Sequence, residues 1–391
     1  MLDAVDLFKQ KSTRDEMGTG SVRDAFADMF FPGTSTIQTR ARYFFFVPWI
    51  YGAQEQRRTP SSEIARRARE GEIRLIEALA AAHPGSGAGV IGITARANLQ
   101  RLPSNIYWQG LGAWHIRTFG GSQEQYHRYL DRHYRQKGSG RPAAGAEAGV
   151  ISYANWHAGM PAPPDNFPAQ CNFKLRPVEA EYLRERIMTR QPGSLLAFMV
   201  DRGLPKVQPM FPWEHPQLAA LPAANREQLV HAQNFSEVIH GASLLYNLML
   251  AEKAKRAELV EQYRVELKDW STALKQRAAE LVKWDRARFW QISQSSGARI
   301  APGTRFFINE WWDIALQWPN STTKSWMQRT GDRIVKREVQ LKGELARLVS
   351  LDALRLWNGA AGTGRLDFRW SQANIIINDI LQGQTGRASN A

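Results

Sequence analysis

Two carboxylates near the N-terminus have a spacing that could support metal or acid–base chemistry. Asp24 and Asp28 stand four positions apart, so a helix over this stretch would place both side chains on one face. A carboxylate pair of this kind can bind Mg²⁺ or exchange protons with a substrate. The same spacing is typical of a solvated helix face beside a core stripe, here Phe26 and Phe30, and we favour that interpretation. A metal-dependent nuclease that uses Asp24 and Asp28 stays open as an alternative.

A second pair combines a carboxylate with an imidazole. Glu237 and His240 have the Glu-x-x-His spacing that places both on one helix face, as in di-iron bundles. Those sites need a second copy of the motif and further glutamates, which the sequence lacks. Polar groups on a core-facing stripe must be hydrogen-bonded, so the pattern favours a buried network. We expect this network to join His231, Asn234, Glu237 and His240.

Other motifs of catalytic chemistry are missing from the sequence. It contains no glycine-rich loop with a phosphate-binding lysine, no G-x-S-x-G elbow and no H-E-x-x-H string. The four histidines at 115, 127, 133 and 157 lack ligand spacing for a metal. We therefore expect no metal and no cofactor, and we lean towards a protein that is not an enzyme.

The charge balance points to a polyanionic partner. The chain carries 51 basic and 37 acidic residues, a net charge of +14, and its isoelectric point is near 10.0. Such an excess concentrates polyanions around a protein, and nucleic acid is the expected one. Residues 1–150 hold 20 basic and 14 acidic residues, and the remainder holds 31 and 23, so no single tail carries the charge. A basic balance also simply keeps many proteins in solution, and it cannot locate a binding surface.

Several cationic and amide side chains stand beside aromatic residues that could stack on bases. The strings Tyr126–Tyr129 and His133–Arg135 interleave cations with rings, a pattern that favours nucleic-acid binding but also occurs in amphipathic core helices. Amides near residues 105–109 would read base edges if this part forms a recognition helix, and Arg117 would meet phosphate. The candidate contact residues are Gln38, Arg40, Arg42, Asn105, Gln109, Arg117, Arg128, Arg132 and Arg135.

The N-terminal elements must position these residues. Ser35 or Thr36 is suited to cap a helix that runs through Phe46 and is ended or kinked by Pro48. Its aromatic residues lie on nearly every face, so Tyr43–Trp49 should form the heart of the core. Further helices at 61–82, 95–102 and 105–114, followed by a strand at 115–119, match the outline of a winged helix-turn-helix.

The remaining chain predicts a second helical domain. Residues 137–149 are rich in Gly, Ala and Pro, so we expect a domain at 1–136, a linker at 137–150 and an all-α domain at 151–382. A long helical pattern runs from Ala224 to about Gln294, interrupted at Gly241, with a break near 269–274. Heptads are not sustained, which favours a bundle over a free coiled coil. The fold class is mainly α, with a flexible tail at 383–391.

Cysteine content and hydropathy limit the cellular compartments in which we expect this protein. A lone Cys171 excludes an intrachain disulfide and fits a reducing environment. The N-terminus lacks the apolar core of a secretory signal, and no stretch approaches the roughly 20 apolar residues of a membrane span. We expect a cytoplasmic protein without a membrane partner.

The stretch GTGSVRDAFADMFFPGTSTIQTRARYFFFVPWIY, residues 18–51, closely resembles the N-terminal hallmark of an uncharacterised bacterial family defined only as a domain of unknown function. RLPSNIYWQGLGAW, FKLRPVEAEYLRERI, NFSEVIHGASLLYNLMLAE and GRLDFRWSQANIIINDI are also similar to that family, so the resemblance covers nearly the whole chain. It implies an association with anti-phage defence gene clusters that encode helicases and phospholipase D-like nucleases. It implies no catalytic residues.

Charge, helix outline and resemblance together predict a non-catalytic subunit of a bacterial anti-phage defence system. We expect it to bind nucleic acid, with DNA favoured, or to act as a scaffold beside other defence proteins such as a helicase or a nuclease. A protein–protein interaction module without nucleic-acid binding is the second hypothesis, because 14 tryptophans supply aromatic faces that a partner could cover.

Overall fold

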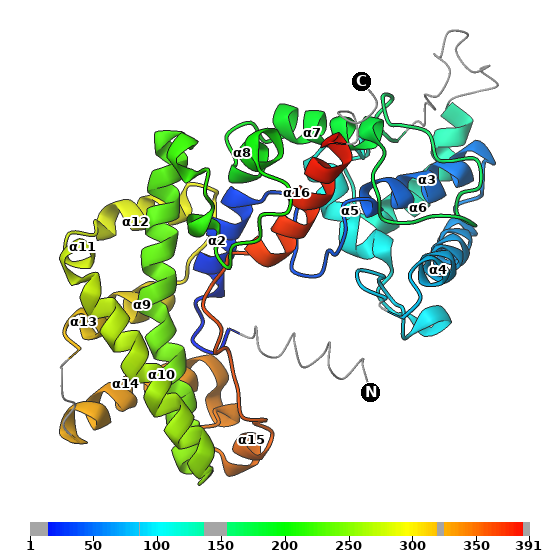
Figure 1. Ribbon diagram of the computed structural model, residues 1–391. Coiled ribbons are helices and arrows are strands. Elements are labelled where there is room, and N and C mark those ends of the chain that lie inside the picture. The colour runs from blue at the N-terminus through cyan, green and yellow to red at the C-terminus, as the bar shows by residue number, and fades with distance from the viewer. Residues whose placement is uncertain (1–14, 86, 137–154, 319–323, 386–391) are drawn as a thin grey trace. The chain divides into compact units, whose positions relative to one another are not determined.

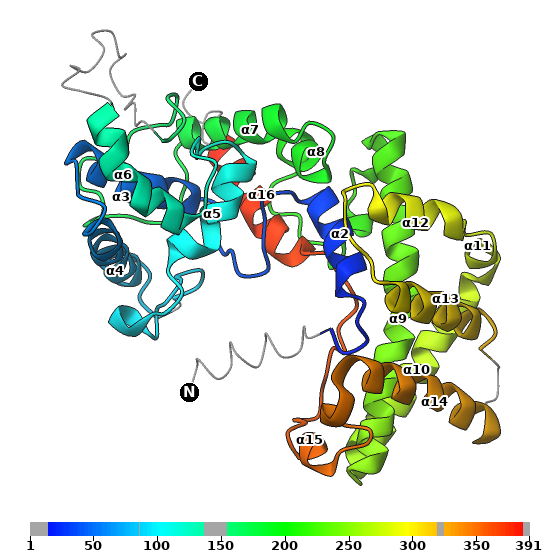
Figure 2. The same ribbon diagram turned by 180° about the vertical axis from the view of Figure 1, so that it is seen from behind.

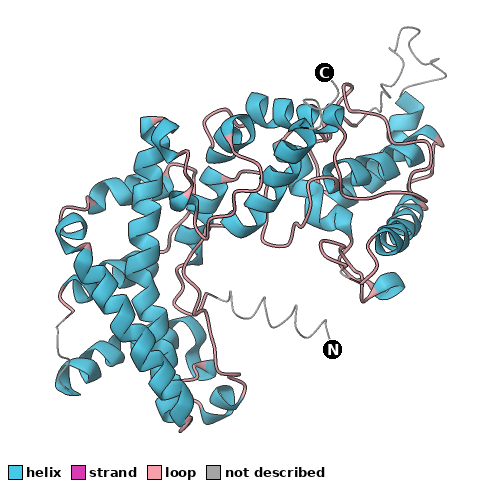
Figure 3. Cartoon of the chain, in the orientation of Figure 1, coloured by secondary structure: helices cyan, strands magenta, loops and turns pink. Residues whose placement is uncertain are grey.

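The computed structural model describes residues 15–85, 87–136, 155–318 and 324–385 (Figure 1). These residues are mainly helical, as the sequence predicts, and no strand occurs among them (Figure 3). An isolated antiparallel bridge joins Arg117 to Trp156. None of the helices in the described ranges is long and apolar enough to cross a membrane.

The chain divides into two compact units. The first unit contains the described residues up to Ala27 and Pro222–Phe368, and the second contains Asp28–Leu221 and the residues from Arg369 onward. Helix α2, Gly20–Phe30, spans this boundary. This division differs from the linear one expected from the sequence. The expected linker at 137–150 lies outside the described residues, and helices on both sides of it belong to the second unit.

The second unit is built around α3, whose aromatic residues from Tyr43 to Trp49 are buried as predicted. Helices α4 and α5 pack against α3, and α7 packs against both α8 and α16. Bonds across the sequence hold the unit together; for example, Arg40 binds Asp379 of α16 in a bidentate pair at 2.7–3.1 Å. The helices are α3 Tyr43–Gln56, α4 Ile64–Ala82, α5 Pro103–Ala113, α6 Gln123–Gln136, α7 Pro177–Arg190, α8 Leu195–Arg202 and α16 Trp370–Thr385. Three short 3-10 turns, η1 Arg96–Asn98, η2 Pro212–Glu214 and η3 Leu218–Ala220, complete it.

The first unit is organised by α9, Ala223–Lys253, which α10, α13 and α14 contact (Figure 2). Aromatic rings fill its core: Trp312 stacks on Trp284 and also contacts Phe289. The other helices are α10 Ala257–Gln276, α11 Ala278–Val282, α12 Arg286–Gln294, α13 Pro302–Leu316, α14 Lys324–Lys342 and α15 Leu351–Arg355, with a 3-10 turn, η4, at Gly343–Leu345.

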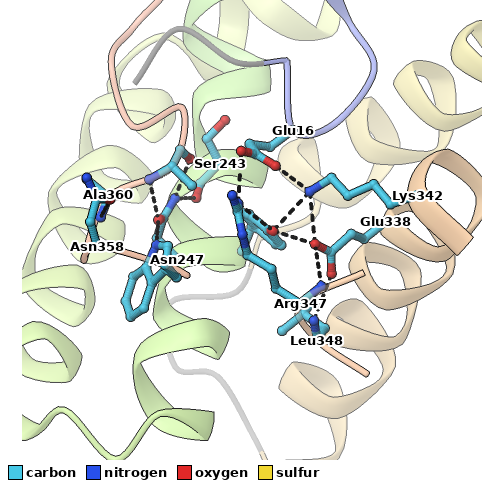
Figure 4. A network of polar contacts seen from close by, with 12 residues as sticks. Glu16, Ser243, Asn247, Glu338, Lys342, Arg347, Leu348, Asn358 and Ala360 are labelled. Atoms are coloured by element: carbon cyan, nitrogen blue, oxygen red, sulfur yellow. Dashed lines mark hydrogen bonds and ion pairs between the residues drawn. The ribbon is translucent and has the colours of Figure 1, made fainter. Parts of the chain in front are cut away.

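Buried polar bonds fix the irregular chain after α14 (Figure 4). Glu338 accepts hydrogen bonds from the backbone N–H groups of Arg347 and Leu348 at 3.0 and 2.9 Å and from the Tyr246 hydroxyl. Although burial alone would raise it, these bonds and Lys342 hold the pKa of Glu338 below its usual value. Asn247 accepts from the Ala361 N–H at 2.9 Å and donates to the Ala361 carbonyl at 2.8 Å. The connector from η4 to Ala361 is therefore anchored to α14 through Glu338 and to α9 through Asn247.

Three sequence-based expectations about elements are wrong. The aromatic helix begins at Tyr43 and not at residue 35 or 36, since residues 35–42 form turns and irregular chain, and Pro48 does not end the helix, which continues to Gln56. The strand expected at 115–119 is a turn with a single bridge at Arg117, so the winged helix-turn-helix is not confirmed. The long helical pattern breaks at residues 254–256, where Lys255 has a φ of 55°, at Arg277 and at residues 283–285, whereas residues 269–274 lie inside α10.

Gly241 does not interrupt α9. It lies inside the helix and lets the Trp270 ring approach the backbone, because an added Cβ would stand 2.3 Å from that ring. Close helix packing, and not a break, explains this glycine.

Candidate nucleic-acid interface

Three arginines form a stripe on α6. Arg128, Arg132 and Arg135 are exposed and follow an i, i+4, i+7 pattern, which places them on one helix face. Arg128 pairs with Glu124 at 2.8 Å, and the Arg135 Nε donates to the Asp131 carbonyl at 3.3 Å. Arg132 and Arg135 have no ion pair within the described part of the chain. Two guanidinium charges on this face therefore remain available to an anion.

The turn between α3 and α4 is attached beside this stripe. The Ser61 N–H donates to Asp131 Oδ1 at 2.9 Å, and the Asp131 N–H donates to Ser61 Oγ at 3.0 Å. Burial is the main cause that raises the pKa of Tyr134 on α6, and the negative charges of Glu55 and Asp131 raise it further. The positive charge of Arg58 lowers this pKa, so Arg58 lies near α6. Its exposed neighbour Arg57 precedes Ser61 in the same turn. We call Arg128, Arg132 and Arg135 the α6 basic face.

The positive charge around α6 comes from arginine alone. Residues 56–136 contain twelve arginines, no lysine and six carboxylates. Arginine presents a rigid fork of donors that matches phosphate oxygens, while lysine supplies only a point charge. Nearby rings are engaged within the fold: Tyr129 contacts Phe119 and His133. The surface therefore suits phosphate contacts better than base stacking.

A buried polar network positions α6 relative to α4 and α5. Glu72 of α4 is fully buried and accepts from the backbone N–H and the hydroxyl of Ser104 at 2.7 and 2.8 Å. The Ser104 hydroxyl accepts from Gln123 Nε2 at 2.9 Å, and the same amide donates to the Tyr51 hydroxyl. Burial raises the pKa of Glu72 to about 7, although the hydrogen bonds from Ser104 act to lower it. The first turn of α6 is thus fixed by a carboxylate that titrates near neutrality.

Three of the sequence-predicted contact residues are buried and bonded internally. Gln38 accepts from the Ser35 N–H and donates to the Gly33 carbonyl, both at 3.2 Å. Arg42 pairs with Glu179 at 3.1 Å. Arg117 lies 4.7 Å from the Trp108 ring and donates to the carbonyls of residues 108, 119 and 121. Their burial argues against direct contact with a ligand, because these side chains hold the fold together.

The other predicted contact residues are distributed differently. Arg40 is half-buried in its pair with Asp379. Asn105 and Gln109 are exposed on α5, and Asn105 Nδ2 donates to Gln123 Oε1 at 2.6 Å. Of the nine predicted residues, Arg128, Arg132 and Arg135 are the three arginines that share one exposed helix face, while Asn105 and Gln109 share an uncharged face of α5.

The carboxylate pair on α2 is engaged by cations. Asp24 pairs with Arg23 at 3.0 Å and Asp28 with Arg369 at 2.5 Å. The described residues contain no group of three His, Cys, Asp or Glu side chains that could hold a metal.

The polar residues of α9 do not form the closed network that the sequence suggested. Arg277 links two of them, since its Nη2 donates to Asn234 Oδ1 at 2.8 Å and its Nη1 donates to the Glu237 carboxylate. His231 accepts from the Trp284 indole at 2.7 Å, and His240 bonds the Thr363 carbonyl at 2.9 Å. Each histidine has a partner of its own, since the side chains point to different neighbouring elements.

A group of cations and imidazoles that sequence reasoning missed lies elsewhere in the second unit. The Arg117–Trp156 bridge sets residues 115–118 against 155–157, where the His157 N–H donates to the Ile116 carbonyl at 2.8 Å. On α7, Arg186 Nη1 donates to His157 Nε2 at 2.7 Å and Arg190 Nη2 to His115 Nδ1 at 2.8 Å. Three separate segments supply these four side chains, so no local spacing could reveal them.

No curated protein and no solved structure matches this chain. One family model, described as a family of unknown function, matches residues 2–383 and so covers nearly the whole sequence. The chain therefore belongs to that family, DUF6361.

Proposed function

We propose that this protein binds nucleic acid, with duplex DNA favoured, through the α6 basic face, as a non-catalytic subunit. The observation that carries the proposal is the arginine stripe on α6 joined to the α3–α4 turn by the reciprocal Ser61–Asp131 bonds. The anti-phage defence setting rests on the family resemblance alone. Binding partners there would be proteins such as a helicase or a nuclease.

The chemistry of the face predicts the mode of binding. Exposed guanidinium groups whose neighbouring rings pack against one another within the fold are suited to contact the phosphate backbone, which carries no base sequence. Neutralising phosphates releases counterions, so the affinity should fall steeply with salt and depend little on sequence.

The test is a fluorescence-anisotropy titration with duplex DNA, single-stranded DNA and RNA at low salt. The variant combines Arg132→Gln and Arg135→Gln, which removes two charges from the face. We expect at least about a tenfold loss of affinity for the preferred nucleic acid.

The matched control removes two exposed charges from α14, with Arg329→Gln and Lys336→Gln. This control should change affinity by less than about twofold, since its charges are not part of the α6 basic face. Absence of binding to all three nucleic acids, or equal losses in both double variants, would reject the proposal.

A second candidate function, docking of a partner protein, is favoured by a separate observation. Six of the fourteen exposed large apolar side chains in the described residues fall within 339–356. Leu345 is 75% and Leu356 82% exposed, on the connector that Glu338 anchors. Contiguous exposed apolar patches are typical of protein–protein contacts, and we propose that these six side chains supply one.

Co-expression with a helicase or a nuclease from the defence gene clusters that the family resemblance implies tests this second candidate. Leu345→Asp with Leu356→Asp should abolish co-elution of the partner. Val282→Asp, at a side chain that is also exposed but lies outside 339–356, should preserve it. Co-elution that survives the double variant would exclude this surface.

A further inference from the structure

The cluster formed by His115, His157, Arg186 and Arg190 has an excess of positive charge at a partly buried position. Arg186 is only 5% exposed, yet within the described part of the chain it forms no ion pair with a carboxylate. Its bonds go to an imidazole, His157 Nε2, and to the Trp114 carbonyl at 3.4 Å. Buried charges in proteins are normally paired with an opposite charge. No carboxylate of the described residues therefore balances the guanidinium charge of Arg186.

Arg190 adds a second cation one turn further along α7. It is exposed and forms no ion pair among the described residues. Its Nη2 donates to His115 Nδ1 instead. Residues i and i+4 of a helix face the same side, and both guanidinium groups lie close enough to His115 and His157 to lower the pKa of each ring. Glu185 is the one carboxylate that acts on His157, and it lies on an exposed position.

The hydrogen-bond roles determine which imidazole nitrogens carry protons. A guanidinium has donors only, so His157 Nε2 and His115 Nδ1 must both accept and are unprotonated. The proton of neutral His115 then sits on Nε2, which becomes a further donor. Burial is the largest cause that lowers the pKa of His115, and the positive charges of Arg190 and Arg186 lower it further. Burial and then the charge of Arg186 lower the pKa of His157 in the same way. Both rings are thus neutral acceptors beside two fixed cations.

His115 also adopts an unusual backbone conformation. Its φ is 55°, in the left-handed region, directly after the end of α5. This turn carries the ring towards α7, where it meets Arg190. Strained backbone of this kind is often found at binding sites.

We propose that Arg186, Arg190 and His115 form a binding site for a phosphate-type oxyanion. Two guanidinium forks and one imidazole N–H would donate to its oxygens, and its negative charge would balance the two arginines. The ligand chemistry is that of inorganic phosphate, pyrophosphate or a terminal phosphate monoester. This site is separate from the α6 basic face and does not depend on the proposed nucleic-acid binding.

The experiment follows the His115 and His157 ring protons by NMR in the full chain during titration with three probes. These are inorganic phosphate, pyrophosphate and a 5′-phosphorylated dinucleotide. Binding should shift both rings saturably and raise their pKa, since an added anion favours the charged imidazole. The probe with the highest affinity identifies the source of the phosphate.

Arg190→Gln should weaken binding by about tenfold or more, because it removes a charged donor from an exposed position. Arg74→Gln, which removes an exposed charge elsewhere in the same unit, should leave the affinity unchanged. No saturable shift with any probe at about 10 mM would overturn the proposal. Equal binding by Arg190→Gln and the unmodified chain would overturn it as well.

Discussion

Arg42 and Glu179 form a buried ion pair at 3.1 Å between the start of α3 and the first turn of α7. The pair joins segments on either side of residues 137–154 within the second unit. Glu179 is also held by Arg176 at 2.7 Å and accepts from the Arg176 N–H at 2.9 Å. A residue that the sequence suggests for ligand contact thus acts as an internal connection.

Replacing Arg42 should destabilise the protein strongly. Arg42→Met leaves the fully buried Glu179 with Arg176 as its remaining cation, and breaking a buried pair costs about 3 kcal/mol or more. Urea denaturation measures the free energy of unfolding. Arg66→Met, which removes an exposed pair with Glu63 and Glu70, should cost less than about 1 kcal/mol. Similar losses in both variants would contradict the assigned role of Arg42.

Glu72 should make stability depend on pH. Burial raises its pKa from 4.5 to about 7 in the folded protein, so between these values the folded state binds more protons than the unfolded chain. Its contribution to the free energy of unfolding is therefore complete below about pH 4.5 and falls as pH rises through about 7. The full change is about 3 kcal/mol.

The measurement compares urea denaturation of the unmodified chain and Glu72→Gln at several pH values. The difference in free energy of unfolding between the two should change across this window, because glutamine does not titrate. Glu70→Gln, at a half-exposed position on the same helix, should show no such trend. A Glu72→Gln difference that is flat with pH would mean that Glu72 stays charged.

Gly241→Ala should disrupt the contact between α9 and α10. The new methyl group would stand 2.3 Å from the Trp270 ring, whose indole N–H also donates to the Glu237 carbonyl at 2.7 Å. Overpacking a filled core costs about 3 kcal/mol when a large ring must move. Thermal unfolding should show a large loss, while Gly364→Ala, with open space around its added methyl, should stay close to the unmodified chain.

Arg117 and Arg132 should behave in opposite ways. Arg117→Ala removes bonds to three carbonyls and the contact with Trp108, so stability should fall while the salt dependence of DNA binding is unchanged. Arg132→Gln should leave the midpoint of unfolding unchanged and reduce the salt slope by about 1. Denaturation and anisotropy at several salt concentrations separate the two effects. If Arg117→Ala instead made the DNA affinity less dependent on salt, Arg117 would contact the nucleic acid directly.

The sequence by itself determined the helical class, the buried aromatic segment from Tyr43 to Trp49 and the family. Each depends on local composition and on hydrophobic pattern, which act over a few helical turns. It also named Arg128, Arg132 and Arg135 among nine candidate contact residues, but only the structure places these three on one exposed face of α6.

Only the tertiary structure decided which polar residues are exposed and which separate segments meet. Gln38, Arg42 and Arg117 are as polar as the residues of the α6 basic face, yet folding buries them with internal partners. His115, His157, Arg186 and Arg190 come together because a β-bridge and α7 converge, and no sequence spacing encodes that meeting. Burial and long-range contact depend on the whole packed unit, so a local pattern predicts helices well and binding surfaces poorly.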